Sequence, residues 1–151
     1  SYARLKQRAR DDGRVPGEET EKLATAEALR GEASLASMGS ALAAGADDLR
    51  AAMALVLEQG SDPEHGPDAV QAYVTPLLNL AGHVLCAWQM GIAALHAQQA
   101  LKDGSDEPFY RAKLSSAEFA IHQWLPVGRA QHAVIEAGWQ CFSQFDSRAA
   151  H

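Results

Sequence analysis

Cysteine, aromatic residues and β-branched runs are all scarce in this sequence, and each scarcity excludes a class of protein. The 151 residues include two cysteines, Cys86 and Cys141, and neither belongs to a C-x-x-C pair. A disulfide framework is therefore not indicated, and buried free thiols in a reducing cytoplasm are the simplest interpretation. Aromatic residues make up only 7% of the chain, and β-branched runs are absent, which disfavours a sheet.

An excess of basic charge and long apolar runs are also missing. The net charge of -6 and the pI near 5.4 argue against a general nucleic-acid binder, whose binding surface is usually basic. No uninterrupted apolar run reaches the ~18–20 residues of a membrane span, and no signal peptide is visible. We therefore expect a cytoplasmic protein with no nucleic-acid partner and no membrane span.

What the sequence does contain is a long, regular helical pattern. From Asp68 to Leu101, apolar or small residues recur in alternating steps of four and three, which places them on one face of a helix. Leu78, Leu85 and Ile92 widen this face, so we expect the helix to be buried along much of its length and to organise the fold. The alternating set comprises Val70, Val74, Leu77, Ala81, Val84, Trp88, Gly91 and Leu95.

Two parts of the chain are expected, residues 1–17 as an N-terminal helix and linker and residues 18–151 as a helical bundle domain. The first segment is basic. It could be an arm that binds nucleic acid or acidic lipid, or its basic residues could lie on the solvent side of a terminal helix, and we favour the second interpretation. Because the chain opens on Ser1 rather than Met, we expect it to be a processed or excised piece of something longer.

Glycine and proline mark the expected ends of the helices. Loops are predicted at 60–67 and 102–107, with Gly60 ending one helix and Pro108 in the first turn of another. One helix could span Gly45 or two could meet there, and we favour a break because Asp47 and Asp48 suit a new first turn.

The prolines raise the same question of continuity. Pro76 predicts either a kink in the long helix or a fresh start with Thr75 as N-cap, and the spacing favours a kink. Pro126 and Gly128 are expected to bend or end the helix that begins near Pro108, before a further helical piece that precedes Gly138. The predicted fold is all-α, a four- to five-helix, mostly antiparallel bundle, because short loops force neighbouring helices to reverse.

Two aromatic groups carry specific expectations. Trp124 ends a periodic stripe that begins at Tyr110, so we expect it to be buried and Trp124→Ala to cost about 3–5 kcal/mol. Trp88 and Trp124 could line a pocket for a flat cofactor, although core packing is the favoured interpretation. Three tail aromatics, Trp139, Phe142 and Phe145, are spaced three apart and must pack on the bundle or on another chain, for which a homodimer is the default.

Candidate metal ligands are sparse. His83 and Cys86 stand three apart, and Glu118 and His122 stand four apart, spacings at which two ligands can point the same way. Carboxylate-bridged metal bundles use Glu-x-x-His pairs, which are absent here, so a core thiol beside a hydrogen-bonded histidine is favoured over zinc. No Gly-x-Ser-x-Gly elbow or Gly-rich phosphate motif is present. We assign no catalytic, cofactor-binding or metal-binding residue.

A family resemblance emerges from the second half of the chain. Leu-Leu-Asn-Leu-Ala-Gly-His-Val-Leu-Cys-Ala-Trp (77–88) is followed by Phe-Tyr-Arg-Ala-Lys-Leu-Ser-Ser-Ala-Glu-Phe (109–119), then Leu125-Pro126 and a helix ending in Glu-Ala-Gly (136–138). This resembles the C-terminal extension domain of multi-domain bacterial acyl-CoA dehydrogenases. The resemblance is closest over 68–138, while residues 1–60 match only in their Ala-rich, helical character.

The resemblance implies a non-catalytic module of an oxidoreductase of fatty acid metabolism. In such flavoproteins FAD and acyl-CoA bind in upstream domains, electrons pass to an electron-transfer flavoprotein, and the extension packs on the catalytic core and its dimer. The family's catalytic glutamate and flavin-contacting glycines have no counterpart here, so we expect no cofactor in this chain and FAD in the parent enzyme. The expected partners are the parent's catalytic domains and a second copy. The alternatives are a self-standing metal-binding protein using His83, Cys86, Glu118 and His122, or a small-ligand-binding bundle.

Overall fold

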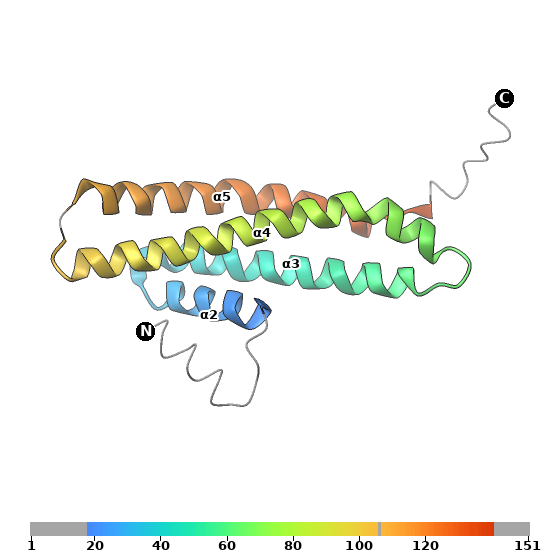
Figure 1. Cartoon of the computed structure of the whole chain (residues 1–151), viewed down its shortest axis with the longest axis horizontal. Helices are drawn as coiled ribbons and strands as arrows, with labels where there is room; N and C mark the ends of the chain where they lie inside the picture. Colours follow the sequence, from blue (N-terminus) through green and yellow to red (C-terminus); the bar gives the residue numbers. More distant parts are fainter. Residues whose placement is uncertain (1–17, 106, 141–151) are drawn as a thin grey trace, which may run out of the picture.

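Four α-helices and one short 3₁₀ helix follow one another in the part of the chain that the structure describes. The computed structural model describes residues 18–105 and 107–140, and neither range contains a strand. The predicted all-α bundle is confirmed, with neighbouring long helices running antiparallel (Figure 1). The predicted N-terminal helix and linker, 1–17, lie outside the described residues. The elements are α2 (Glu18–Arg30), η1 (Ala33–Leu35), α3 (Ala36–Gly60), α4 (Gly66–Lys102) and α5 (Pro108–Glu136).

The expected organising helix is α4, and it contacts each of the other three α-helices. Local chemistry explains where α4 begins and ends. Pro67 lies in the first turn, where its missing N–H leaves no hydrogen bond unmade. Asp68 in the first turn and Lys102 in the last turn have the charges that the helix dipole favours at those ends. By length and composition, α4 is the helix of the described chain that could cross a membrane, a test that the core helix of a soluble protein also passes. The expected absence of a membrane span therefore stays a prediction.

The predicted buried face of α4 is wrong in its first half. Val70, Val74 and Leu78 are 43%, 45% and 65% exposed, whereas Val84 and Trp88 are buried as expected. A helix repeats every 3.6 residues, and a strict seven-residue repeat drifts from it by about 20° per heptad. The observed set contains an extra step of four and follows the helix more closely. This regular set comprises Ala69, Tyr73, Pro76, Leu80, Val84, Ala87, Gly91 and Ala94, and Gly66, Trp88 and Ala97 are buried in addition.

The predicted break near Gly45 is also wrong, because α3 is continuous from Ala36 to Gly60. Gly45 is buried, and a Cβ built on it would lie 2.7 Å from Leu125 Cδ2. Its lack of a side chain therefore lets α3 and α5 approach closely, and it does not end a helix. The expected end at Gly60 is confirmed.

Both internal prolines lie within continuous helices. Pro76 is buried inside α4, so the alternative of a new helix capped by Thr75 does not occur. Pro126 likewise lies inside α5, which continues to Glu136 and ends before Gly138, where φ is +90°. The prediction that the helix could end at Pro126 and Gly128 is wrong, because α5 continues through both residues. Gly128 instead allows α5 to pack closely on α4, since a Cβ there would lie 3.2 Å from Leu80 Cδ1.

Helix α2 packs on the bundle through the buried side chains of Ala26 and Leu29, and two further contacts fix its position. Trp88 Nε1 donates to Thr25 Oγ1 at 2.9 Å, and both side chains are buried. Gly39 of α3 lies so close to α2 that a Cβ there would be 2.6 Å from the carbonyl oxygen of Ala26. These contacts fix α2 against α3 and α4 at one end of the bundle (Figure 1).

Candidate functional site

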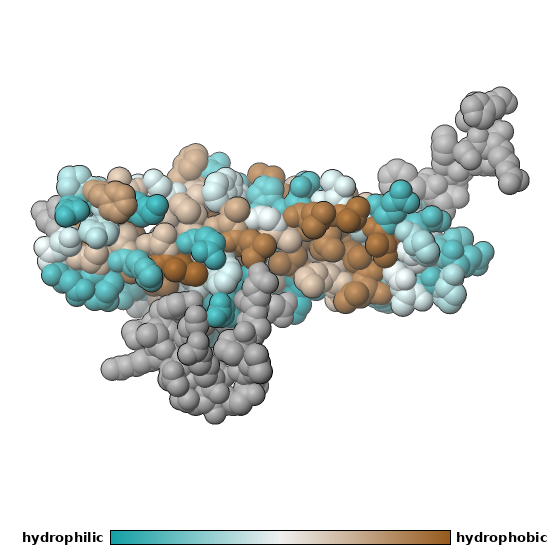
Figure 2. Space-filling model, in the orientation of Figure 1, coloured by the Kyte–Doolittle hydropathy of each residue, from teal (hydrophilic) through white to brown (hydrophobic). Residues whose placement is uncertain are grey.

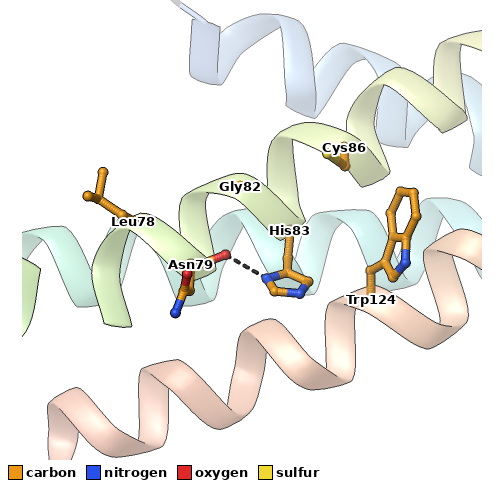
Figure 3. A pocket seen from close by; sticks show the side chains of 6 residues that line it. All are labelled: Leu78, Asn79, Gly82, His83, Cys86 and Trp124. Carbon is orange, nitrogen blue, oxygen red and sulfur yellow. Dashed lines mark hydrogen bonds between the residues drawn. The ribbon is translucent and has the colours of Figure 1, made fainter. Parts of the chain in front are cut away.

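An open groove of about 300 Å³ runs along the boundary of α4 and α5. Its α4 wall consists of residues spaced three and four apart, which share one side of the helix. Gly82 leaves room in this wall, because a Cβ there would meet nothing within 4 Å. Figure 3 shows Trp124 rising from α5 toward the α4 turn that carries Cys86. The lining residues are Leu78, Asn79, Gly82, His83, Cys86 and Trp124.

The groove histidine is fixed by its own helix. His83 Nδ1 lies 2.6 Å from the carbonyl oxygen of Asn79, one turn earlier. Because a carbonyl oxygen only accepts, Nδ1 carries the proton, and Nε2 is the acceptor of the neutral ring. The predicted hydrogen-bonded histidine is confirmed. The predicted core thiol is wrong, since Cys86 is exposed on the outward side of α4.

The four candidate metal ligands do not form a site. Glu118 is exposed and His122 Nε2 lies 3.4 Å from Ser37 Oγ of α3, and neither residue lines the groove that holds His83 and Cys86. Among residues 18–105 and 107–140, no three His, Cys, Asp or Glu side chains are placed to hold a metal ion.

The two helical tryptophans face different parts of the molecule. Trp88 is 9% exposed and packs against α2, with Lys22 Nζ 5.6 Å from the centre of its ring. Trp124 is 38% exposed, so its predicted burial is wrong, and the neighbouring Leu125 occupies the core instead. Trp88 does not line the groove that contains Trp124, so the two rings do not share this site.

A second hollow, of about 430 Å³, lies at the turn between α3 and α4. The Asp62 carboxylate accepts the backbone N–H groups of Glu64 and His65 at 2.8 and 3.0 Å. These backbone hydrogen bonds, first that of His65, lower the pKa of Asp62. Trp139 folds back here and is buried, its ring centre 5.6 Å from that of the exposed His65. Phe142 and Phe145 lie outside the described residues.

A charge cluster that the sequence analysis missed joins α3 to α5. Arg129 Nε donates to Asp48 Oδ2 at 3.0 Å, and His132 Nδ1 lies 3.5 Å from Asp48 Oδ1. His132 Nε2 also lies 3.7 Å from Glu136 Oε1, one turn further along α5. Only the i, i+4 spacing of His132 and Glu136 was visible in the sequence. The partner Asp48 is 84 positions away from His132, and only the fold brings it close.

A continuous apolar surface covers the neighbouring parts of α3 and α4, which we call the α4 face. It is the brown region in the right half of Figure 2. The residues that define it are Met53, Leu57, Val70, Val74 and Leu78, exposed by 44%, 72%, 43%, 45% and 65%. Leu78 also lines the groove, so the α4 face and the groove adjoin.

Comparisons with known proteins give consistent results. The sequence model of the family described as "Acetyl-CoA dehydrogenase C-terminal like" matches residues 18–146. A stretch of 101 residues, 67% of the chain, is 35% identical to the 3-methylmercaptopropionyl-CoA dehydrogenase of Ruegeria pomeroyi. The match covers 16% of the length of that relative. No solved structure matches the chain.

Proposed function

The chain belongs to the acetyl-CoA dehydrogenase C-terminal-like family, and on this premise we propose that it is the non-catalytic helical module of an FAD-dependent acyl-CoA dehydrogenase. The observation that carries the proposal is the family match over nearly the whole bundle, residues 18–146. The relative from Ruegeria pomeroyi, itself an acyl-CoA dehydrogenase by name, supports it.

The module's role is to pack on the catalytic domains and to shape their assembly as a homodimer. The exposed α4 face supports this role, because apolar patches of several side chains usually mark a contact. The parent enzyme would oxidise an acyl-CoA thioester in the cytoplasm, as a step of fatty acid metabolism, and pass the electrons to an electron-transfer flavoprotein.

The groove between α4 and α5 does not fit FAD. A flavin dinucleotide needs cations or converging backbone N–H groups for its pyrophosphate. The groove between α4 and α5 contains neither Lys nor Arg in its lining, and its walls are the middles of two helices. We therefore propose that FAD binds in the rest of the parent enzyme, and we assign no step of the reaction to this chain.

Expression of the complete gene product tests the proposal. We expect a yellow protein that reduces an electron acceptor when an acyl-CoA is added, whereas the 151-residue chain alone should be colourless and inactive. Removal of residues 1–151 from the complete product should change its number of subunits, measured by sedimentation, and should not merely lower the mass of each chain by 16.1 kDa. A gene product without a dehydrogenase part, or flavin bound stoichiometrically to the 151-residue chain, would contradict the proposal.

A further inference from the structure

Helix α4 carries no formal charge between its ends. From Ala69 to Leu101 the sequence contains no Asp, Glu, Lys or Arg. The exposed sides of its neighbours differ, since α3 presents Asp47 and Arg50 and α5 presents Lys113 and Glu118. A solvent-facing helix of a soluble bundle is normally polar on its outer side. The outer side of α4 therefore has the composition of a surface that is covered by something.

The described residues leave much of α4 uncovered. In an apolar stretch of 18 residues within α4, only 28% of the stretch is buried within the molecule. Leu57 and Leu78, on adjacent helices, are among the most exposed large apolar side chains of the described residues, at 72% and 65%. Large contiguous patches of this kind mark protein or membrane contacts.

The groove beside Leu78 adds shape to this surface. Energetically dominant residues of protein interfaces are bulky side chains that fill pockets near the centre of the contact. The hollow at Gly82, bounded by Leu78, Cys86 and Trp124, has about 300 Å³, enough to receive a bulky apolar or aromatic side chain of a partner.

We propose that the α4 face and the adjoining groove are the surface on which the dehydrogenase part of the same polypeptide docks, an inference that rests on the proposed function. The match covers 16% of the related dehydrogenase, so most of such an enzyme lies outside this chain. A part joined by a linker is present at a high effective concentration, which favours it over a second copy at the same surface. A lipid surface is disfavoured because membrane-surface helices carry Lys and Arg, and residues 69–101 have none.

Cys86 provides the reporter for the test. It is exposed in the groove, and a Cys141→Ser background leaves it as the single thiol of residues 1–151. Its rate of alkylation by a maleimide is measured, by mass spectrometry of the chymotryptic peptide, in the 151-residue chain and in the complete gene product. We expect the rate in the complete product to be lower by about tenfold, the factor for roughly nine molecules in ten docked.

Matched variants then identify the surface. Leu78→Asp and Val74→Asp should return the Cys86 rate of the complete product to that of the 151-residue chain. Phe119→Asp on α5 is the control, because Phe119 is as exposed as Leu78, at 67% against 65%, but lies outside the α4 face and the groove. This variant should leave Cys86 protected. Circular dichroism of each variant chain checks that the helices are retained, as expected for exposed positions.

The outcomes separate this inference from the proposed function. Equal Cys86 rates in both proteins, with a yellow and active complete product, would overturn the docking surface alone. A colourless, inactive product would overturn both. Protection of the 151-residue chain that grows with its own concentration would assign the face to a second copy, and protection by anionic phospholipid vesicles would assign it to lipid, and either result overturns the inference.

Discussion

The indole of Trp88 and the hydroxyl of Thr25 form a buried hydrogen bond between α4 and α2, with 2.9 Å between Nε1 and Oγ1. The Thr25 hydroxyl in turn donates to the carbonyl oxygen of Glu21 at 2.9 Å, so each donor of the pair is satisfied. Removing the hydroxyl would leave the indole N–H buried without an acceptor. The pair therefore makes the docking of α2 specific.

Substitution of Thr25 tests this pair. Thr25→Val keeps the side-chain shape but removes the acceptor, and should lower the free energy of unfolding by about 1–3 kcal/mol. Thr25→Ser is the control, because it retains the hydroxyl and should cost less than Thr25→Val. Urea denaturation measures both, and equal losses in the two variants would show that the hydroxyl has no special role.

Two glycines should respond to alanine in opposite directions. A Cβ at Gly39 would lie 2.6 Å from the backbone oxygen of Ala26, so Gly39→Ala should destabilise by about 1–3 kcal/mol. A Cβ at Gly82 meets nothing within 4 Å, so Gly82→Ala should stabilise by up to about 1 kcal/mol through helix propensity. Thermal melts of the two variants check the order, and a stabilised Gly39→Ala would show that α2 is not held as described.

For two side chains of α5, the loss of unfolding free energy on truncation to alanine should follow their burial rather than their size. Ile121 is fully buried, and Ile121→Ala should cost about 2–5 kcal/mol. Trp124 is 38% exposed, so Trp124→Ala should cost less than Ile121→Ala, and less than the sequence analysis expected. Denaturant unfolding gives both values. A greater loss for Trp124 would place its ring in the core after all.

The turn between α3 and α4 should weaken in acid. Backbone hydrogen bonds from His65 and Glu64 lower the pKa of Asp62 in the folded state below its ordinary value. A lowered folded pKa contributes stability that is present above the unfolded pKa and is lost as the pH falls through the folded pKa. The Asp62 carboxyl should titrate in NMR at a lower pH in the folded chain than in the denatured chain, and Asp62→Asn should remove its part of the acid dependence. A titration at the same or a higher pH in the folded chain would contradict the stabilising role of these hydrogen bonds.

Self-association is expected from the tail. Trp139 packs beside His65 on its own bundle, while Phe142 and Phe145 lie outside the described residues. The 151-residue chain is expected to sediment as a dimer at micromolar concentration, and Phe142→Ser with Phe145→Ser should shift it toward monomer with helicity retained. A monomeric wild type would remove the dimer, and lost helicity would place the tail in the core.

Local signals in the sequence predicted the helix ends, whereas long-range contacts decided the rest. Pro108 and Gly60 mark helix ends by backbone chemistry that acts within one turn. The sequence alone predicts a break at Gly45, because the residue that explains this glycine, Leu125, is 80 positions away. The same holds for the groove, since the spacing of His83 and Cys86 placed them together but could not show that Cys86 faces outward. In a helix as rich in small residues as α4, the period alone leaves its rotation about its own axis undetermined.

The missing charges of α4 have a practical consequence for probing the fold. No Lys or Arg occurs between Arg50 and Lys102, so trypsin, which cleaves after these residues, has no site in the 52-residue segment Ala51–Lys102. Survival of this segment in a tryptic digest is therefore expected whether the α3–α4 hairpin is folded or not. Chymotrypsin distinguishes the two states, because Tyr73 and Trp88 are buried in the bundle and become cleavable only when it opens.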